Sequence, residues 1–131
     1  MALEGLAAAE FAAADRPELK QRLSDIQDEM NAWEESGSHD RFAGLNNSWH
    51  ELILEGAGND YIRQFISYLT VPIYRLLFST FYTMERIKLA NADHRIITAA
   101  ILEGRAEDAE RAMRAHITAG LEALSELDSH F

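Results

Sequence analysis

Apolar residues recur at steps of three and four along almost the whole chain, which is the spacing of amphipathic helices. The clearest run alternates steps of four and three: Leu19, Leu23, Ile26, Met30 and Trp33. A stripe with this spacing is typical of a helix that packs against other helices of its own chain or of a partner. The pattern predicts an all-α protein built as a helical bundle.

Prolines, glycines and capping residues divide this pattern into six expected helices. The expected ranges are 2–14, 17 to the serine and glycine cluster at 36–38, 38–55, 60–88, 91–104 and 106–127. Pro17 suits the first turn of the second helix, where its missing N–H has no cost. Pro72 should kink the fourth, because its ring removes one backbone hydrogen bond. Asn91 is expected to cap the fifth helix, and Gly104 to end it.

Composition limits the classes of protein that fit. The chain has 131 residues, 12 basic and 22 acidic side chains, a net charge of −10 and no cysteine. We expect one domain that does not bind nucleic acid directly, because its charge would repel a phosphate backbone. The least charged stretch, 64–84, is interrupted by Pro72 and Arg75, so we expect no membrane span. The lack of cysteine excludes thiolate sites and fits a reducing, cytoplasmic location.

Three histidines interrupt the apolar pattern on faces that should be buried. His50 shares the inward face of the third helix with Asn46, one turn earlier. His94 precedes the apolar positions of the fifth helix, and His116 lies within the apolar stripe of the sixth. A divalent metal is one partner that all three imidazoles could share. The alternative is that each histidine is a core residue bonded to a backbone carbonyl or a carboxylate.

Arg75 is the single charged residue between 64 and 84. Its guanidinium stays protonated, so a buried Arg75 needs an anion or carbonyl groups near it. Steps of seven place Tyr68 and Tyr82 on the same stripe, which suits the lining of a pocket. Arg75 could instead reach solvent or pair with a glutamate of another helix. Together with the histidines, this stripe suggests a cavity in which a metal binds a small carboxylate and Arg75 orients it.

An open metal held by three histidines also describes a hydrolytic or lyase site. Such an enzyme needs a general base near the metal. The candidates beside the histidines, Asp93 and Glu51, are expected to point away from the inward faces. We therefore expect no catalysis. A metal-dependent enzyme acting on small organic acids and a structural dimerisation bundle remain the alternatives.

Four stretches of the chain carry a resemblance to a known family. They are LEGLAA at 3–8, RPELKQRLSDIQDEM at 16–30, LNNSWHELILEGAGN at 45–59 and DHRIITAAILEGRAEDAERAMRAHI at 93–117. They resemble the FCD domain, the C-terminal effector-binding domain of the FadR-type branch of the GntR superfamily of bacterial transcription regulators. The third stretch is similar to the family's Asp-x-x-Phe-His pattern. The last stretch, with two histidines 22 residues apart, is the most specific part.

The resemblance implies an antiparallel bundle of six or seven helices enclosing a pocket with a metal, zinc first and nickel or manganese as alternatives. The family's three histidine ligands correspond to His50, His94 and His116, and its aspartate ligand corresponds to Asn46. Trp49 stands where the family has phenylalanine. Because asparagine offers a neutral oxygen, the site would keep one more positive charge, which favours an anionic ligand.

The same resemblance implies a function for the chain. We expect residues 1–131 to form a single effector-sensing domain, without the winged helix-turn-helix that contacts DNA in the family. It would bind a small carboxylate near the metal and transmit occupancy through helix shifts to a DNA-binding domain. A homodimer is also expected. Arg105 replaces the acidic helix cap usual in the family, so the turn before the last helix could differ.

Overall fold

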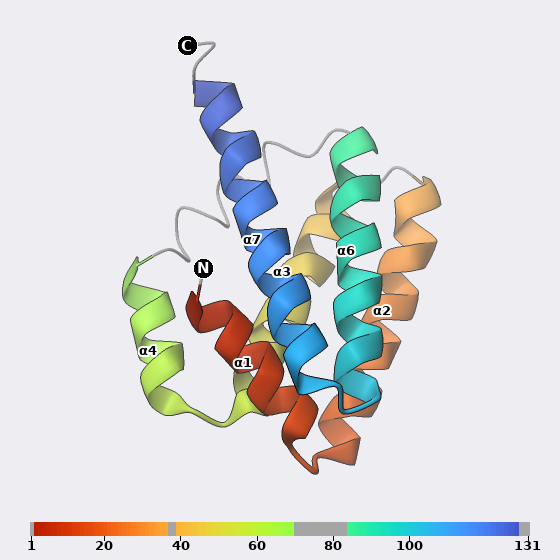
Figure 1. The fold of residues 1–131 in the computed structure, drawn as a ribbon. Coiled ribbons are helices and arrows are strands. Elements are labelled where there is room, and N and C mark those ends of the chain that lie inside the picture. The colour runs from red at the N-terminus through yellow and green to blue at the C-terminus, as the bar shows by residue number, and fades with distance from the viewer. Residues whose placement is uncertain (1, 37–38, 70–83, 129–131) are drawn as a thin grey trace.

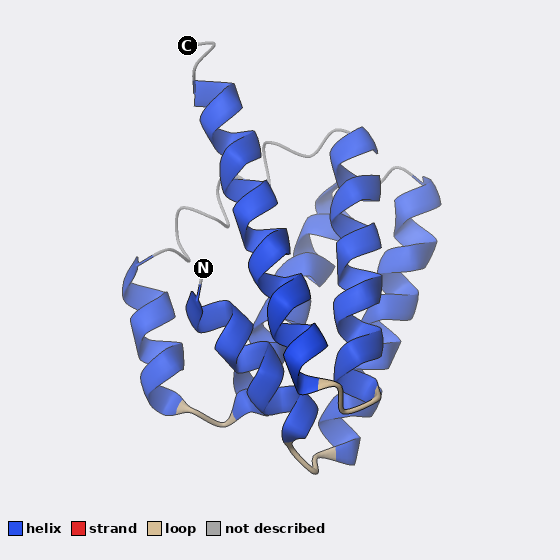
Figure 2. Cartoon of the chain, viewed as in Figure 1, coloured by secondary structure: helices blue, strands red, loops and turns tan. Residues whose placement is uncertain are grey.

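The computed structural model describes residues 2–36, 39–69 and 84–128. These residues form six helices: α1 (Ala2–Ala13), α2 (Pro17–Ser36), α3 (His39–Ala57), α4 (Asp60–Leu69), α6 (Met84–Leu102) and α7 (Ala106–Asp128). No strand occurs within those ranges (Figure 2), and the expectation of an all-α bundle is confirmed. None of the helices in the described ranges is long and apolar enough to cross a membrane.

The four longest helices run side by side (Figure 1). α2 packs against α3 and α6, and α6 packs against α7, with each of these neighbours antiparallel to the next. α1 lies across α7 and also contacts α3 and α6, whereas α4 is at the edge of the bundle against α1 and α3. The inner faces of α3, α6 and α7 therefore meet in the middle of the bundle.

Most of the expected helix boundaries agree with the structure. α2 begins at Pro17, and α7 begins at Ala106. Gly104 has a φ of 72°, the left-handed conformation that ends a helix at low cost for glycine. The expected long helix over 60–88 can be followed only to Leu69, because Pro72 and its proposed kink lie outside the described residues.

The predicted start of the fifth helix at Asn91 is wrong. α6 begins at Met84, so Asn91 lies two turns inside the helix and is fully buried. Its side chain does not cap a helix end; it hydrogen-bonds to Gln27, Asn31 and Glu34 of α2. Capping preference is a local property, and here contacts between helices override it.

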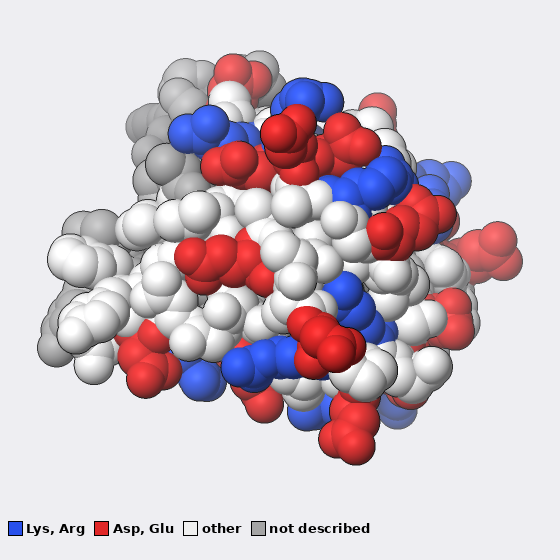
Figure 3. Space-filling view, turned by 60° about the horizontal axis from the view of Figure 1, so that its bottom comes forward, with Lys and Arg blue, Asp and Glu red and all other residues white. Residues whose placement is uncertain are grey.

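Charged side chains of both signs are intermixed over the face shown in Figure 3. At the turn between α6 and α7, Arg105 forms ion pairs with Glu103 and Asp108, at N–O distances of 2.6 and 2.9 Å. The Arg105 backbone N–H donates to the carbonyl of Ala100 at 2.8 Å. Arg105 thus closes this turn with ion pairs in place of an acidic cap.

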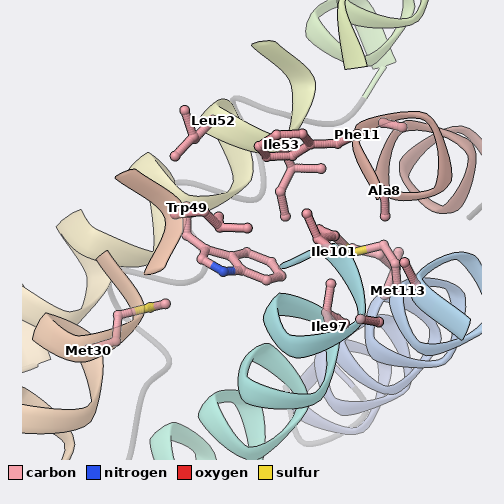
Figure 4. Packing of buried hydrophobic residues seen from close by; sticks show 14 of the residues in the cluster. Ala8, Phe11, Met30, Trp49, Leu52, Ile53, Ile97, Ile101 and Met113 are labelled. Atoms are coloured by element: carbon pink, nitrogen blue, oxygen red, sulfur yellow. The ribbon is translucent and has the colours of Figure 1, made fainter. Parts of the chain in front are cut away.

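The hydrophobic core is centred on aromatic and long aliphatic side chains from all the longer helices (Figure 4). Its largest fully buried members are Phe11, Leu23, Met30, Phe42 and Trp49, with isoleucines of α3 and α6. Trp49 reaches from α3 toward α6, next to Ile97 and Ile101 in the view of Figure 4. The core therefore joins residues of α1, α2, α3, α6 and α7 in one cluster.

α1 packs closely on α3 at Gly56. A Cβ at this position would lie 2.5 Å from the Phe11 ring, which is itself fully buried. We expect Gly56→Ala to lower the free energy of unfolding by about 1–2 kcal/mol, because overpacking outweighs the gain in helix propensity. Urea denaturation followed by circular dichroism measures this change.

Gly44 of the same helix is the matched control, since a Cβ there meets nothing within 4 Å. Gly44→Ala should raise the free energy of unfolding by about 0.5–1 kcal/mol. Equal effects of the two substitutions would contradict the packing of α1 on α3.

Candidate metal centre

Three histidine side chains from three helices meet inside the bundle. His50 comes from α3, His94 from α6 and His116 from α7. The ring centroids are 5.8 Å apart for His50 and His94, 5.7 Å for His50 and His116, and 4.8 Å for His94 and His116. One ring nitrogen from each lies within 4.8 Å of the others. The three imidazoles selected from helical periodicity therefore do converge.

His94 is the most deeply buried of the three rings, with an exposed fraction of 0%. Among the described residues, neither Nδ1 nor Nε2 of His94 has a hydrogen-bond partner. A satisfied core histidine would bond at least one ring nitrogen to a carbonyl or a carboxylate. The alternative of three separately satisfied core histidines thus fails at His94, and the donor set fits a metal.

Asn46 lies one turn before His50 on α3, as the sequence indicated, and is 1% exposed. Within the described part of the chain, its Oδ1 atom accepts no hydrogen bond. An amide oxygen buried without a partner costs free energy, as an imidazole does. This oxygen is therefore the candidate for a fourth, neutral ligand.

Asp93 contacts the histidine cluster formed by His50, His94 and His116, and the expectation that it points away from the inward face is wrong. Its Oδ2 atom lies 3.0 Å from Nδ1 of His116, and its own side chain is 41% exposed. Asp93 directly precedes His94 on α6, yet it reaches across to α7. When Nδ1 of His116 donates to this carboxylate, Nε2 keeps its lone pair for a metal, which is the usual arrangement behind histidine ligands. Glu51, in contrast, is exposed on α3.

Burial keeps the imidazoles of His50 and His94 neutral. Loss of hydration, with the nearby His116 as the smaller cause, lowers the pKa of His50 to about 3. The pKa of His94 is also well below its ordinary value, first because of burial and then because of His116 and His50. Neutral imidazole is the form that binds metals, so the site does not need to lose protons from these two rings before binding.

Trp49 packs against all three imidazoles, a role that the sequence did not show. Its ring centroid is 4.4 Å from that of His94, 4.8 Å from that of His50 and 6.3 Å from that of His116. Its Nε1–H donates to Oγ1 of Thr98 at 2.9 Å. The only signal available in the sequence was a tryptophan directly before His50 on the inward face.

The expected carboxylate-binding residues are not placed by the structure. Arg75 and Tyr82 lie outside the described residues, and Tyr68 belongs to α4 but its side chain is not described. Their shared stripe and the enclosed pocket remain predictions.

Comparison with known families identifies the family of this chain. The FCD domain family matches residues 1–119, so this chain belongs to that family. The FCD domain is the effector-binding domain of GntR-family transcription regulators, a regulatory ligand-binding domain. None of the curated proteins compared with the sequence matches it.

The lowered pKa values of His50 and His94 predict a pH-dependent stability. Unfolded histidine takes up a proton below about pH 6.5, whereas the folded rings stay neutral. The contribution of these two neutral rings to the free energy of unfolding is therefore fully present above about pH 6.5. It is lost as the pH falls toward the pKa values of the folded state. We expect a decrease of about 1.4 kcal/mol per pH unit for each histidine.

Urea unfolding of the metal-free chain between about pH 7 and pH 5 measures this slope before most carboxylates titrate. His94→Gln should remove one histidine's share of the slope, whereas substitution of the exposed His39 by glutamine should leave it unchanged. The same slope in His94→Gln as in the wild type would show that His94 is not held neutral.

Proposed function

We propose that this chain is the effector-sensing domain of a bacterial transcription regulator that binds a divalent metal through Asn46, His50, His94 and His116. Zinc is the metal that best suits a set of neutral imidazoles, and nickel or manganese are the alternatives. The single observation that carries the proposal is the convergence of three imidazoles around His94, whose ring nitrogens have no partner in the described residues.

A bound divalent ion would supply positive charge and open coordination positions for an anionic ligand. With a neutral oxygen from Asn46 and three neutral imidazoles, the ligands leave the charge of the ion uncompensated. We therefore propose a small carboxylate as the effector. In this proposal Tyr68 of α4, with Arg75 and Tyr82 from the segment between α4 and α6, orients the carboxylate.

In this proposal the site binds its ligand and does not convert it. Asp93 is the carboxylate that contacts the cluster within the described ranges, and its Oδ2 accepts a hydrogen bond from His116. Asp93 therefore orients the imidazole of His116 and does not serve as a general base. Occupancy would pass through helix shifts to a DNA-binding domain, and two such chains would form a homodimer in the cytoplasm.

Zinc titration by calorimetry, with elemental analysis of the dialysed protein, tests the site. We expect the wild type to bind one zinc ion, and His94→Ala and His116→Ala each to weaken zinc affinity by about 100-fold or more, because each removes a ligand. Helix content should be retained. The control is His39→Ala, which changes an exposed histidine of α3. Unchanged zinc stoichiometry and affinity in both cluster variants would contradict the proposal.

Replacing the neutral Asn46 by aspartate should change the affinity for the metal and the affinity for the effector in opposite directions. Asn46→Asp adds one negative charge beside the imidazoles, so zinc should bind more tightly, on the order of tenfold. Small mono- and dicarboxylates should then bind more weakly to the zinc-loaded protein, because the net charge of the site is lower.

Asn47→Asp is the matched control for this experiment. It makes the same change in net charge one residue further along α3, at a partly exposed position. If both variants change zinc and carboxylate affinity equally, general electrostatics would explain the effect and Asn46 would not be a ligand.

A further inference from the structure

Buried polar side chains form a continuous chain of hydrogen bonds between α3, α6 and α2. Trp49 Nε1 donates to Thr98 Oγ1 at 2.9 Å, and Thr98 Oγ1 donates to Gln27 Oε1 at 2.9 Å. Gln27 Nε2 in turn donates to Asn91 Oδ1 at 2.9 Å and to Asn31 Oδ1 at 3.0 Å. We call Trp49, Thr98, Gln27, Asn91 and Asn31 the relay.

The inner end of the relay lies against the metal centre. Trp49 is fully buried, and its ring contacts the rings of His50, His94 and His116. Its closest ring neighbour is His94, at 4.4 Å between centroids. Because a packed interior has little free volume, a movement of the His94 ring toward a bound ion would change its contact with the indole.

The outer end of the relay reaches the surface between α2 and α6. Asn91 Nδ2 donates to Asn31 Oδ1 at 2.9 Å and to Glu34 Oε1 at 3.2 Å. Arg95, whose side chain is 44% exposed, forms an ion pair with Glu34 at 3.3 Å. The chain of hydrogen bonds thus extends from the middle of the bundle to charged groups in contact with water.

The chemistry of the groups gives the relay a single direction. Indole N–H can only donate, so the Thr98 hydroxyl must accept from Trp49 and use its one hydrogen for Gln27. This fixes the orientation of the Gln27 carboxamide, whose two N–H groups then serve Asn91 and Asn31. Reversing any one of these hydrogen bonds would leave a buried donor or acceptor unpaired, which costs free energy. The side chains of the relay therefore have to move together.

We infer that Thr98 and Gln27 are positioning residues that couple metal binding at the histidine cluster to the packing of α2 on α6, acting through Trp49. The inference rests on the proposed metal site. It depends on the indole N–H of Trp49, which donates the hydrogen bond to Thr98. By thermodynamic linkage, a relay that adjusts when metal binds must also influence how tightly the metal binds.

Two-dimensional NMR of the ¹⁵N-labelled chain during zinc titration tests this inference. We expect zinc to shift the Trp49 indole N–H and the Gln27 side-chain NH₂ signals of the wild type. Gln21, which lies on the exposed side of α2 and donates to Asp25, should not shift and is the internal control. Thr98→Val keeps the shape of the side chain but removes the hydroxyl. In Thr98→Val the Gln27 signals should no longer respond, and zinc affinity should fall by about fivefold or more.

Thr98→Ser restores the hydroxyl and should recover both the Gln27 response and the zinc affinity. Recovery separates a role of the hydrogen bond from a loss of packing. If Thr98→Val does not fold, Trp49→Phe is the second variant, because it keeps an aromatic ring beside the histidines but removes the N–H. In Trp49→Phe the Gln27 signals should likewise no longer respond to zinc.

The outcomes distinguish this inference from the proposed function. A wild type that binds zinc without any shift at Gln27 would overturn the relay and leave the metal site intact. The same conclusion would follow if Gln27 still responded in Thr98→Val, or in Trp49→Phe where that variant replaces it. A wild type that binds no zinc would overturn both the metal site and the relay.

Discussion

Burying an imidazole among aliphatic and aromatic side chains costs free energy unless its ring nitrogens find partners. In this bundle α3, α6 and α7 each direct one histidine to a common point, and His94 at the centre is fully buried. The protein therefore folds around a polar cluster in an apolar interior. A divalent ion would satisfy the rings together, so the free energy of metal binding would also stabilise the packing of the three helices.

The cluster is held in place by a second layer of contacts. Asp93 binds one ring nitrogen of His116 from the solvent side, and Trp49 packs against all three imidazoles from the core side. The two supports differ in chemistry, because one is a partly exposed carboxylate and the other a buried indole. The cluster is thus linked to a partly exposed carboxylate on one side and to the packing of α3 on α6 on the other.

Helical periodicity was sufficient to predict the bundle and the convergence of the histidines, because both follow from which face of each helix is buried. Predictions that depended on a single side chain were less successful. Asn91 looked like a helix cap, but its partners lie on α2, about 60 residues away in the sequence. Asp93 was expected to face away, yet a carboxylate next to His94 can reach a neighbouring helix. Hydrogen bonds between helices, such as that from Trp49 to Thr98, have no periodic signature.

In the proposed site His50, His94 and His116 act together as ligands of one ion. X-ray absorption spectroscopy at the zinc edge, on the 131-residue chain loaded with one equivalent of zinc, tests it most directly. We expect a first shell of nitrogen and oxygen with the outer-shell scattering of three imidazoles. A spectrum with oxygen ligands alone, or with a single imidazole, would contradict it.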